Sequence, residues 1–269
     1  MQPLSDFPRP QMRAIRYVLA DIDDTITTHG RLTPAAYGAM ARMQEAGLTV
    51  IPITGRPAGW CDHFARMWPI DGIVGENGAF YFRYDHATRR FHKRFAADQQ
   101  QRRKNRQQLD RVAAMILRDV PGSAMASDQM YREADIAIDF CEDVAALSEI
   151  DIARIVSLME SQGLTAKVSS IHFNGWIGSY DKLTMTRSLL ADLFDCDMER
   201  DKPAFVFVGD SPNDQPLFRF FPNAVGVANL RTFEKDLDFL PAYVTSGEAG
   251  TGFVELADAL IDARSPLTV

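Results

Sequence analysis

Short apolar runs separated by a helical pattern open the chain. Residues 15–20 and 48–53 are mostly apolar with little alternation, which is typical of parallel strands buried on both faces. Between them, Thr33 and Pro34 supply an N-cap and a first-turn proline, and good helix formers follow at residues 35–46. This pattern predicts a βαβ unit with the usual right-handed crossover.

The middle of the chain has a different pattern. Two aromatic-rich runs, residues 79–84 and 90–95, flank a polar turn and predict a β-hairpin. The other elements predicted here are helices at residues 98–118 and 149–161 and strands at residues 165–168 and 171–173. Hairpins mixed with helices indicate a small α+β domain rather than further βαβ units.

Parallel-type strands return in the last third of the chain. The elements predicted there are a helix from about Lys182 to Leu193 and short strands at residues 204–208, 225–227 and 243–245, with one more at residues 72–74 before the hairpin. We therefore predict an α/β fold in which residues 1–82 and 179–269 form a parallel-sheet core domain. Residues 83–178 are predicted to form a domain inserted into that core.

The composition indicates a soluble globular protein. The net charge of −7 argues against general binding to nucleic acid or to a membrane surface. The three cysteines are widely spaced and lack a CxxC motif, which disfavours disulfides or structural zinc and favours a reducing compartment. We find no signal-peptide core and no apolar run of membrane-spanning length, so a cytoplasmic location is expected.

Three carboxylates, Asp21, Asp23 and Asp24, lie directly after the first predicted strand. Side chains alternate along a strand, so a strand that ends here places Asp21 and Asp23 on the same side. Such crowding is costly unless a cation or a shared proton relieves it. A calcium-binding loop does not fit, because its sixth and twelfth positions would be Ile26 and Leu32. The cluster therefore points to a divalent metal and to phosphoryl chemistry.

Further polar groups stand at predicted strand ends or at a helix start: Thr54-Gly55-Arg56, Lys182, and the run Gly209–Asp214. Groups that follow parallel strands gather at the carboxyl edge of the sheet, where open α/β sheets bind ligands. Magnesium prefers oxygen ligands, and Asp21 and Asp210, with Asp214 or its hydration shell, would serve. Taken singly, each residue has a structural alternative, since such aspartates and threonines commonly cap turns or helices and lysines are commonly solvated.

Together these motifs resemble the haloacid dehalogenase (HAD) superfamily of phosphohydrolases. The matching segments are Asp21-Ile22-Asp23-Asp24-Thr25 for its DxDxT motif, Thr54 for the second motif, Lys182 for the third and residues 209–214 for the GDxxND fourth. Residues 76–79 and 225–229 resemble signatures of subclass IIB, the Cof-like type. This resemblance implies a Rossmann-like core with an α+β cap domain. The third motif departs from the subclass pattern, since Leu183 stands where many members carry glycine.

The resemblance also implies a role for each motif. Asp21 would be the nucleophile that forms an aspartyl-phosphate, and Asp23 the general acid for the leaving group and then the base for water. Mg²⁺ is the implied cofactor, held by Asp21, the backbone carbonyl of Asp23 and Asp210, with Asp214 close by or bound through water. The groups implied to hold the transferring phosphoryl group are Thr54, Gly55, Lys182 and Asn213.

The function that follows is a magnesium-dependent phosphomonoester hydrolase acting on a small phosphorylated metabolite, such as a sugar phosphate. Two alternatives stay open: a phosphomutase of the phosphomannomutase type, and a regulatory binding module that keeps the fold. Candidate substrate contacts in the inserted domain are Asp139, His172, Asn174 and Trp176. Residues 83–111 hold ten Arg or Lys against three Asp, which could attract a second acid group of the substrate but is more typical of a solvated helix face.

Overall fold

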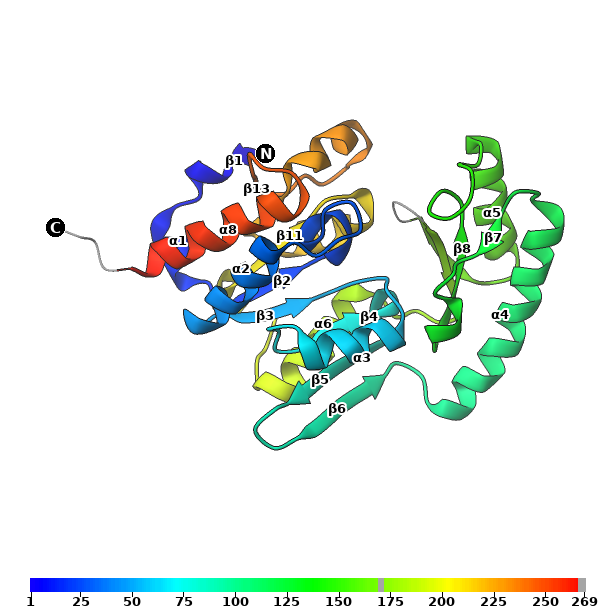
Figure 1. The fold of residues 1–269 in the computed structure, drawn as a ribbon, viewed down its shortest axis with the longest axis horizontal. Coiled ribbons are helices and arrows are strands. Elements are labelled where there is room, and N and C mark those ends of the chain that lie inside the picture. Colours follow the sequence, from blue (N-terminus) through cyan, green and yellow to red (C-terminus); the bar gives the residue numbers. More distant parts are fainter. Residues whose placement is uncertain (169–171, 266–269) are drawn as a thin grey trace.

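The computed structural model describes residues 1–168 and 172–265, and its core is a parallel sheet (Figure 1). The six strands lie in the order β1 (Gln2–Pro3), β13 (Tyr243–Val244), β12 (Ala224–Gly226), β11 (Phe205–Gly209), β2 (Tyr17–Ala20) and β3 (Thr49–Pro52). Each neighbouring pair in this sheet is parallel. The predicted α/β fold is confirmed.

Helices cover both faces of this sheet. They are α1 (Arg9–Ala14), α2 (Pro34–Glu45) and α8 (Ala249–Arg264) on one face, and α6 (Lys182–Phe194) and α7 (Gln215–Phe220) on the other. Val18 and Ala20 of β2 pack in the first of these layers, and Tyr17 and Leu19 pack in the second. Because β2 is covered on both faces, it is apolar without alternation.

A small antiparallel sheet extends the core beside β3. Its strands are β4 (Ile73–Gly75), β5 (Phe80–Asp85) and β6 (Arg90–Phe95), with α3 (Ala58–Met67) packed against the first two. Val74 also forms a parallel bridge with Ile53, just after β3. The predicted hairpin thus pairs with a core strand. We propose that the inserted domain begins after Phe95 rather than at residue 83.

The inserted domain is an antiparallel sheet with two helices on one face (Figure 1). Its strands are β7 (Ala124–Met125), β8 (Asp135–Asp139), β10 (His172–Trp176) and β9 (Thr165–Val168), and its helices are α4 (Gln99–Asp119) and α5 (Glu149–Ser161). Phe173 packs under the helices, so the alternate residues His172, Asn174 and Trp176 lie on the opposite face. The strand predicted at residues 171–173 begins at Ile171, outside the described residues.

The sequence pattern did not predict α3 or α8. Helix α3 has no side-chain N-cap, and α8 carries Gly250 and Gly252 in its first turn, where glycine weakens a helix. A Cβ atom at Gly250 would lie 2.8 Å from the carbonyl oxygen of Ile26. The close packing of α8 against the turn after Asp21 therefore requires glycine at position 250. Glycine lowers helical propensity, so the sequence pattern did not indicate a helix here.

Candidate active site

The strand-end carboxylates converge at the carboxyl edge of the sheet. Asp21 follows β2, Asp210 follows the neighbouring strand β11, and Asp214 lies one turn further on. One oxygen atom of each lies within 4.8 Å of the others, and all three residues are buried. An all-oxygen donor set suits Mg²⁺, so these residues could hold the predicted cation.

Lys182 connects this cluster to the start of α6. Its Nζ lies 2.7 Å from Asp21 Oδ1 and 3.0 Å from Asp214 Oδ1. It also donates to Asn213 Oδ1 at 3.3 Å. The structure thus brings together Asp21, Lys182 and the fourth motif, which the sequence predicted as one site.

The backbone that carries Lys182 is held from two sides. Asp181 and Thr184 form a capping box at the start of α6. Across from it, Gly78 has a φ of 105°, and a Cβ atom there would overlap the carbonyl of Asp181. The close approach therefore needs a glycine at position 78. Because Gly78 supplies the space in this contact, the position after Lys182 can carry Leu183 instead of glycine.

The buried charges shift one another's pKa values. Burial raises the pKa of Asp21 to about 7, although Lys182 opposes this shift. Burial and the charges of Asp21 and Asp214 raise the pKa of Asp210 well above its usual range. Burial alone would lower the pKa of Lys182, but Asp21 and Asp214 raise it, so the lysine stays charged. A divalent cation would favour the ionised carboxylates.

Asp23 lies in different surroundings, because Arg56 holds it. Arg56 donates from Nε to Asp23 Oδ1 at 3.0 Å and from Nη2 to the same oxygen at 2.8 Å. The guanidinium group also lies 4.7 Å from the ring centre of Trp60. Arg56 follows Thr54 and Gly55 in the sequence. Its position next to a predicted motif was the feature from which a role in the site could have been predicted.

A cavity of about 30 Å³ lies over Asp21. Of the predicted site residues it is lined by Asp21, Asp23, Gly55, Lys182, Asp210 and Asn213. Thr54 is fully buried just behind it, and its hydroxyl accepts a hydrogen bond from the backbone N–H of Arg56 at 3.0 Å. Asp214 is also fully buried and accepts from the backbone N–H of Asp210 at 3.2 Å. These two residues organise the loops that line the cavity.

The inserted domain closes this cavity from the other side. His172, Asn174 and Arg132 line it, and Trp176 lines a neighbouring cavity. Asp139 lines neither of these cavities, because it accepts the backbone N–H groups that follow β8, such as that of Cys141 at 2.9 Å. The basic residues between positions 83 and 111 do not line either cavity, which agrees with a solvated face.

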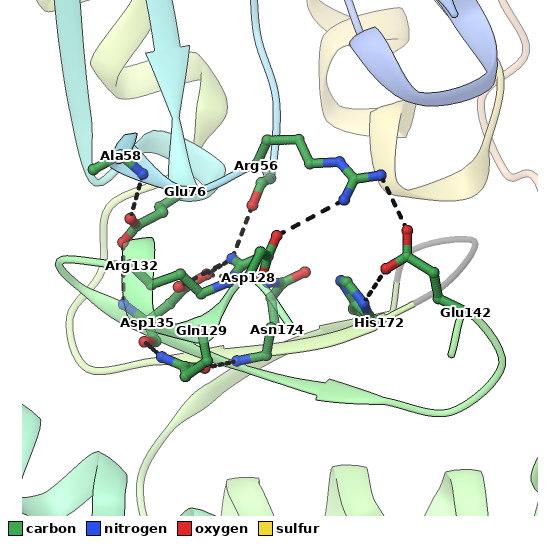
Figure 2. Close-up of polar contacts among 12 residues, drawn as sticks. Arg56, Ala58, Glu76, Asp128, Gln129, Arg132, Asp135, Glu142, His172 and Asn174 are labelled. Carbon is green, nitrogen blue, oxygen red and sulfur yellow. Dashed lines mark hydrogen bonds and ion pairs between the residues drawn. The ribbon is translucent and has the colours of Figure 1, made fainter. Parts of the chain in front are cut away.

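Figure 2 shows how the inserted domain is joined to the core. Glu76, fully buried, accepts hydrogen bonds from the backbone N–H groups of Ala58 at the start of α3 and of cap residues Glu133, Ala134 and Asp135, at 2.6–3.3 Å. Arg132 donates to the carbonyl of Gly55 at 3.0 Å. The sequence marked residues 76–79 only as a signature and gave Glu76 no role. The core thus binds the backbone of the inserted domain through hydrogen bonds, beside the loop formed by residues 54–56.

A second unassigned residue contacts the carboxylate cluster. Asn229 donates from Nδ2 to the carbonyl of Asp24 at 3.1 Å and to Asp210 Oδ2 at 3.5 Å. Asp24 itself has a left-handed φ of 53°. The third carboxylate of the first motif therefore lies in the turn, and its backbone carbonyl anchors that turn to the loop after β12.

The parallel sheet, the acidic edge with its buried lysine, and the closing α+β cap define a class: a Rossmann-like α/β core domain with an inserted cap over the carboxyl edge of its sheet. A family model described as haloacid dehalogenase-like hydrolase matches residues 18–132. That match covers the first two motifs, and together with the shared fold it agrees with the relationship predicted from the motifs. No curated protein sequence matches the chain.

Solved structures with this fold cover nearly the whole chain. Protein 0175 of Thermoplasma acidophilum has 18% sequence identity and a TM-score of 0.68, with 91% of this chain and 98% of that chain covered. A HAD/COF-like hydrolase from Plasmodium vivax has 14% identity and a TM-score of 0.66, with 95% and 99% covered. The sucrose-phosphatase of Synechocystis, solved with sucrose and phosphate, has 15% identity and a TM-score of 0.62, with 93% and 98% covered. Among the described residues, no helix is long and apolar enough to cross a membrane.

Proposed function

We propose that this protein is a magnesium-dependent phosphomonoester hydrolase acting on a small phosphorylated metabolite, in particular a sugar phosphate. The observation that carries the proposal is the convergence of Asp21, Lys182 and Asp210 in one closed cavity. The similar fold of a sucrose-phosphatase supports a sugar phosphate as substrate. The proposed catalytic residues are Asp21 and Asp23.

In the proposed reaction, a carboxylate oxygen of Asp21 attacks phosphorus and the bond to the leaving-group oxygen breaks. Asp23 gives a proton to that oxygen. Asp23 then accepts a proton from water as the water attacks phosphorus in the aspartyl-phosphate, which releases inorganic phosphate and restores Asp21. Lys182, which lies 2.7 Å from Asp21, orients the nucleophile and offsets charge on the phosphoryl group.

Mg²⁺ would be held by Asp21, Asp210 and the backbone carbonyl of Asp23, with Asp214 near it, and would neutralise charge on the phosphoryl oxygens. Gly55 and Asn213 line the cavity, and with Thr54 behind them they would hold the phosphoryl group. The protein's own contribution is then to position the two aspartates and exclude water.

Phosphate release with Mg²⁺ across sugar, polyol and nucleotide phosphates tests this proposal. We expect turnover that EDTA abolishes and that Asp21→Asn reduces by at least about a thousandfold, because the covalent step is lost. Asp258→Asn, an exposed carboxylate paired with Arg42, is the matched control and should keep full activity. Undiminished turnover by Asp21→Asn would refute the covalent mechanism.

The same assay separates the two alternatives. Steady phosphate release without a bisphosphate activator excludes a phosphomutase. A complete lack of turnover on every phosphomonoester, with Mg²⁺ present, would favour a binding module instead.

A further inference from the structure

Two neighbouring cavities lie between the core and the cap. The cavity over Asp21 measures about 30 Å³ and its neighbour about 50 Å³, and both are lined by Asn77, Lys182 and Asn213. The remaining residues of the second cavity are Lys167, Trp176, Asp181, Leu183, Pro216 and Leu217. A phosphoryl group held by Lys182 and Asn213 in the first cavity would therefore have the second cavity beside it.

Two residues that line the second cavity each carry a hydrogen-bond donor that has no partner in the described part of the chain. The donors are Nδ2 of Asn77 and Nε1 of Trp176, and both atoms are buried. A buried donor without an acceptor costs about 1–3 kcal/mol. Asn174, by contrast, uses its Nδ2 to donate to Asp135 at 3.1 Å. The unmet donors point to an acceptor that a bound molecule supplies.

The turn around Asn77 has a left-handed backbone. The φ of Asn77 is 54°, between Glu76 at 43° and Gly78 at 105°. Asparagine adopts this region more readily than most residues, so the strained residue here is Glu76. The Asn77 N–H donates to the carbonyl of Thr54 at 3.1 Å, which ties this turn to the second motif. Its side-chain amide nitrogen would lie 3.2 Å from a Cβ atom placed on Gly55, so the turn fixes the side chain against the loop that carries the second motif.

The charges around the first cavity are already matched. Arg56 lies 2.8 Å from Asp23. It also lies 3.5 Å from Glu142, a pair that Figure 2 shows. Arg132 lies 2.9 Å from Asp128 and 3.1 Å from Asp135. A carboxylate on the leaving group would therefore compete with carboxylates that already occupy both guanidinium groups.

The second cavity adds only one further cationic side chain for an anion to bind. Lys167 is exposed at its edge, and Asp181 lines the same cavity and offsets its charge. Apart from Asn77, Lys182 and Asn213, which it shares with the first cavity, the rest of the lining is the indole of Trp176 with leucine and proline side chains. Such a surface suits an uncharged ring that carries hydroxyl groups.

We propose that Asn77 and Trp176 bind the leaving group by donating hydrogen bonds to its uncharged oxygen atoms. The preferred substrates are then phosphate monoesters of neutral sugars or polyols, and carboxylated phosphates are disfavoured. This inference rests on the proposed phosphatase activity and assigns specificity to two residues outside the four catalytic motifs.

The test compares kcat/KM for hexose 6-phosphates, 3-phosphoglycerate and p-nitrophenyl phosphate in the wild type and in Asn77→Gly and Trp176→Phe. Glycine tolerates the positive φ at position 77, and phenylalanine keeps a ring at position 176, so both variants should fold. Each change should lower the ratio of hexose phosphate to p-nitrophenyl phosphate activity by about tenfold, the effect of one neutral hydrogen bond. Trp68→Phe, which lines neither cavity, should leave the ratio unchanged.

We also expect the wild type to prefer the best hexose phosphate over 3-phosphoglycerate by at least about tenfold. Equal losses on hexose phosphate and p-nitrophenyl phosphate would overturn the inference, since the two residues would then act on the phosphoryl group or on folding. An unchanged ratio, or a wild type that hydrolyses p-nitrophenyl phosphate but no hexose phosphate, would overturn it as well. A wild type inactive on all these esters would instead refute the proposed phosphatase function.

Discussion

At the scale of single residues, two aspartates two positions apart have different environments. Asp21 is buried against Lys182, which lies 2.7 Å away, whereas the Asp23 side chain is 26% exposed and is held by Arg56. A nucleophile benefits from a fixed position beside a cation, and a proton carrier must reach both the leaving group and water. The difference in surroundings matches the two roles proposed for them.

With a good leaving group, Asp23→Ala should therefore slow hydrolysis of the aspartyl-phosphate more than its formation. With p-nitrophenyl phosphate, which needs little protonation, we expect kcat to fall about 100-fold or more and phosphorylated enzyme to accumulate. Rapid acid quench followed by mass measurement of the intact protein detects the added phosphoryl group. Asp24→Asn, which keeps the turn and its left-handed φ, is the control. Full steady-state activity of Asp23→Ala would contradict the assigned role.

At the scale of elements, the turn Glu76–Gly78 contacts three parts of the site: the loop at residues 54–56, the start of α6 and the cap. Its glycine allows the approach to Asp181, so Gly78→Ala should displace the start of α6 and Lys182 with it. Strain and overlap together should cost about 2–4 kcal/mol of unfolding free energy, measured in urea. Gly47→Ala, with a φ of 78° and no atom within 4 Å of the added Cβ, should cost only about 1 kcal/mol. Equal losses would show that the overlap is relieved at no cost.

The Glu76 carboxylate makes the stability of the protein depend on pH. Burial, and then the charge of Asp135, raise the pKa of Glu76 to about 7, whereas its ordinary value is 4.5. Between these values the folded state keeps a proton that the unfolded state has lost, so the unfolding free energy falls as the pH rises through this range.

Glu76→Gln should remove this contribution. Urea unfolding at about pH 5 and about pH 8, in EDTA, should show a smaller loss on raising the pH in the variant than in the wild type, by about 1–3 kcal/mol. The other buried carboxylates are present in both proteins, so the difference reports on position 76. The same pH dependence in both proteins would show that Glu76 ionises normally in the folded state.

Sequence patterns predicted the elements whose residues carry their own signals. The continuous apolar runs of β2 and β3 and the capped start of α2 were of this kind, and the spacing of Asp21, Lys182 and Asp210 placed the centre of the site. The links between core and cap were not predicted, because Glu76 bonds to backbone N–H groups of residues 133–135, and a backbone donor leaves no trace in the sequence. Arg56 was grouped with Thr54 and Gly55 but given no role, and Arg132 was not singled out, because the partners of both arginines lie on distant segments of the chain.

At the scale of the whole molecule, the structure is a closed state. The two cavities measure about 30 and 50 Å³, whereas pockets that hold ligands of metabolite size span about 300–1,000 Å³. The cap must therefore move away from the core to admit a substrate of the size proposed above. The bonds that oppose this movement include those from Glu76 to the cap backbone and from Arg132 to Gly55.

Hydrogen exchange at the cap backbone should report this opening directly. The N–H groups of Glu133 and Ala134 donate to Glu76 at 2.9 and 2.6 Å, so they exchange only when these bonds break. At about pH 8, where Glu76 is ionised, Glu76→Gln turns one acceptor oxygen into an amide that repels the N–H groups, and exchange at these positions should rise about tenfold or more. Amides within α2, which is remote from the cap, are the internal control and should keep their rates. Unchanged exchange at residues 133–135 would mean that the cap is held closed by its other contacts, and that Glu76 only completes the hydrogen bonding of a buried turn.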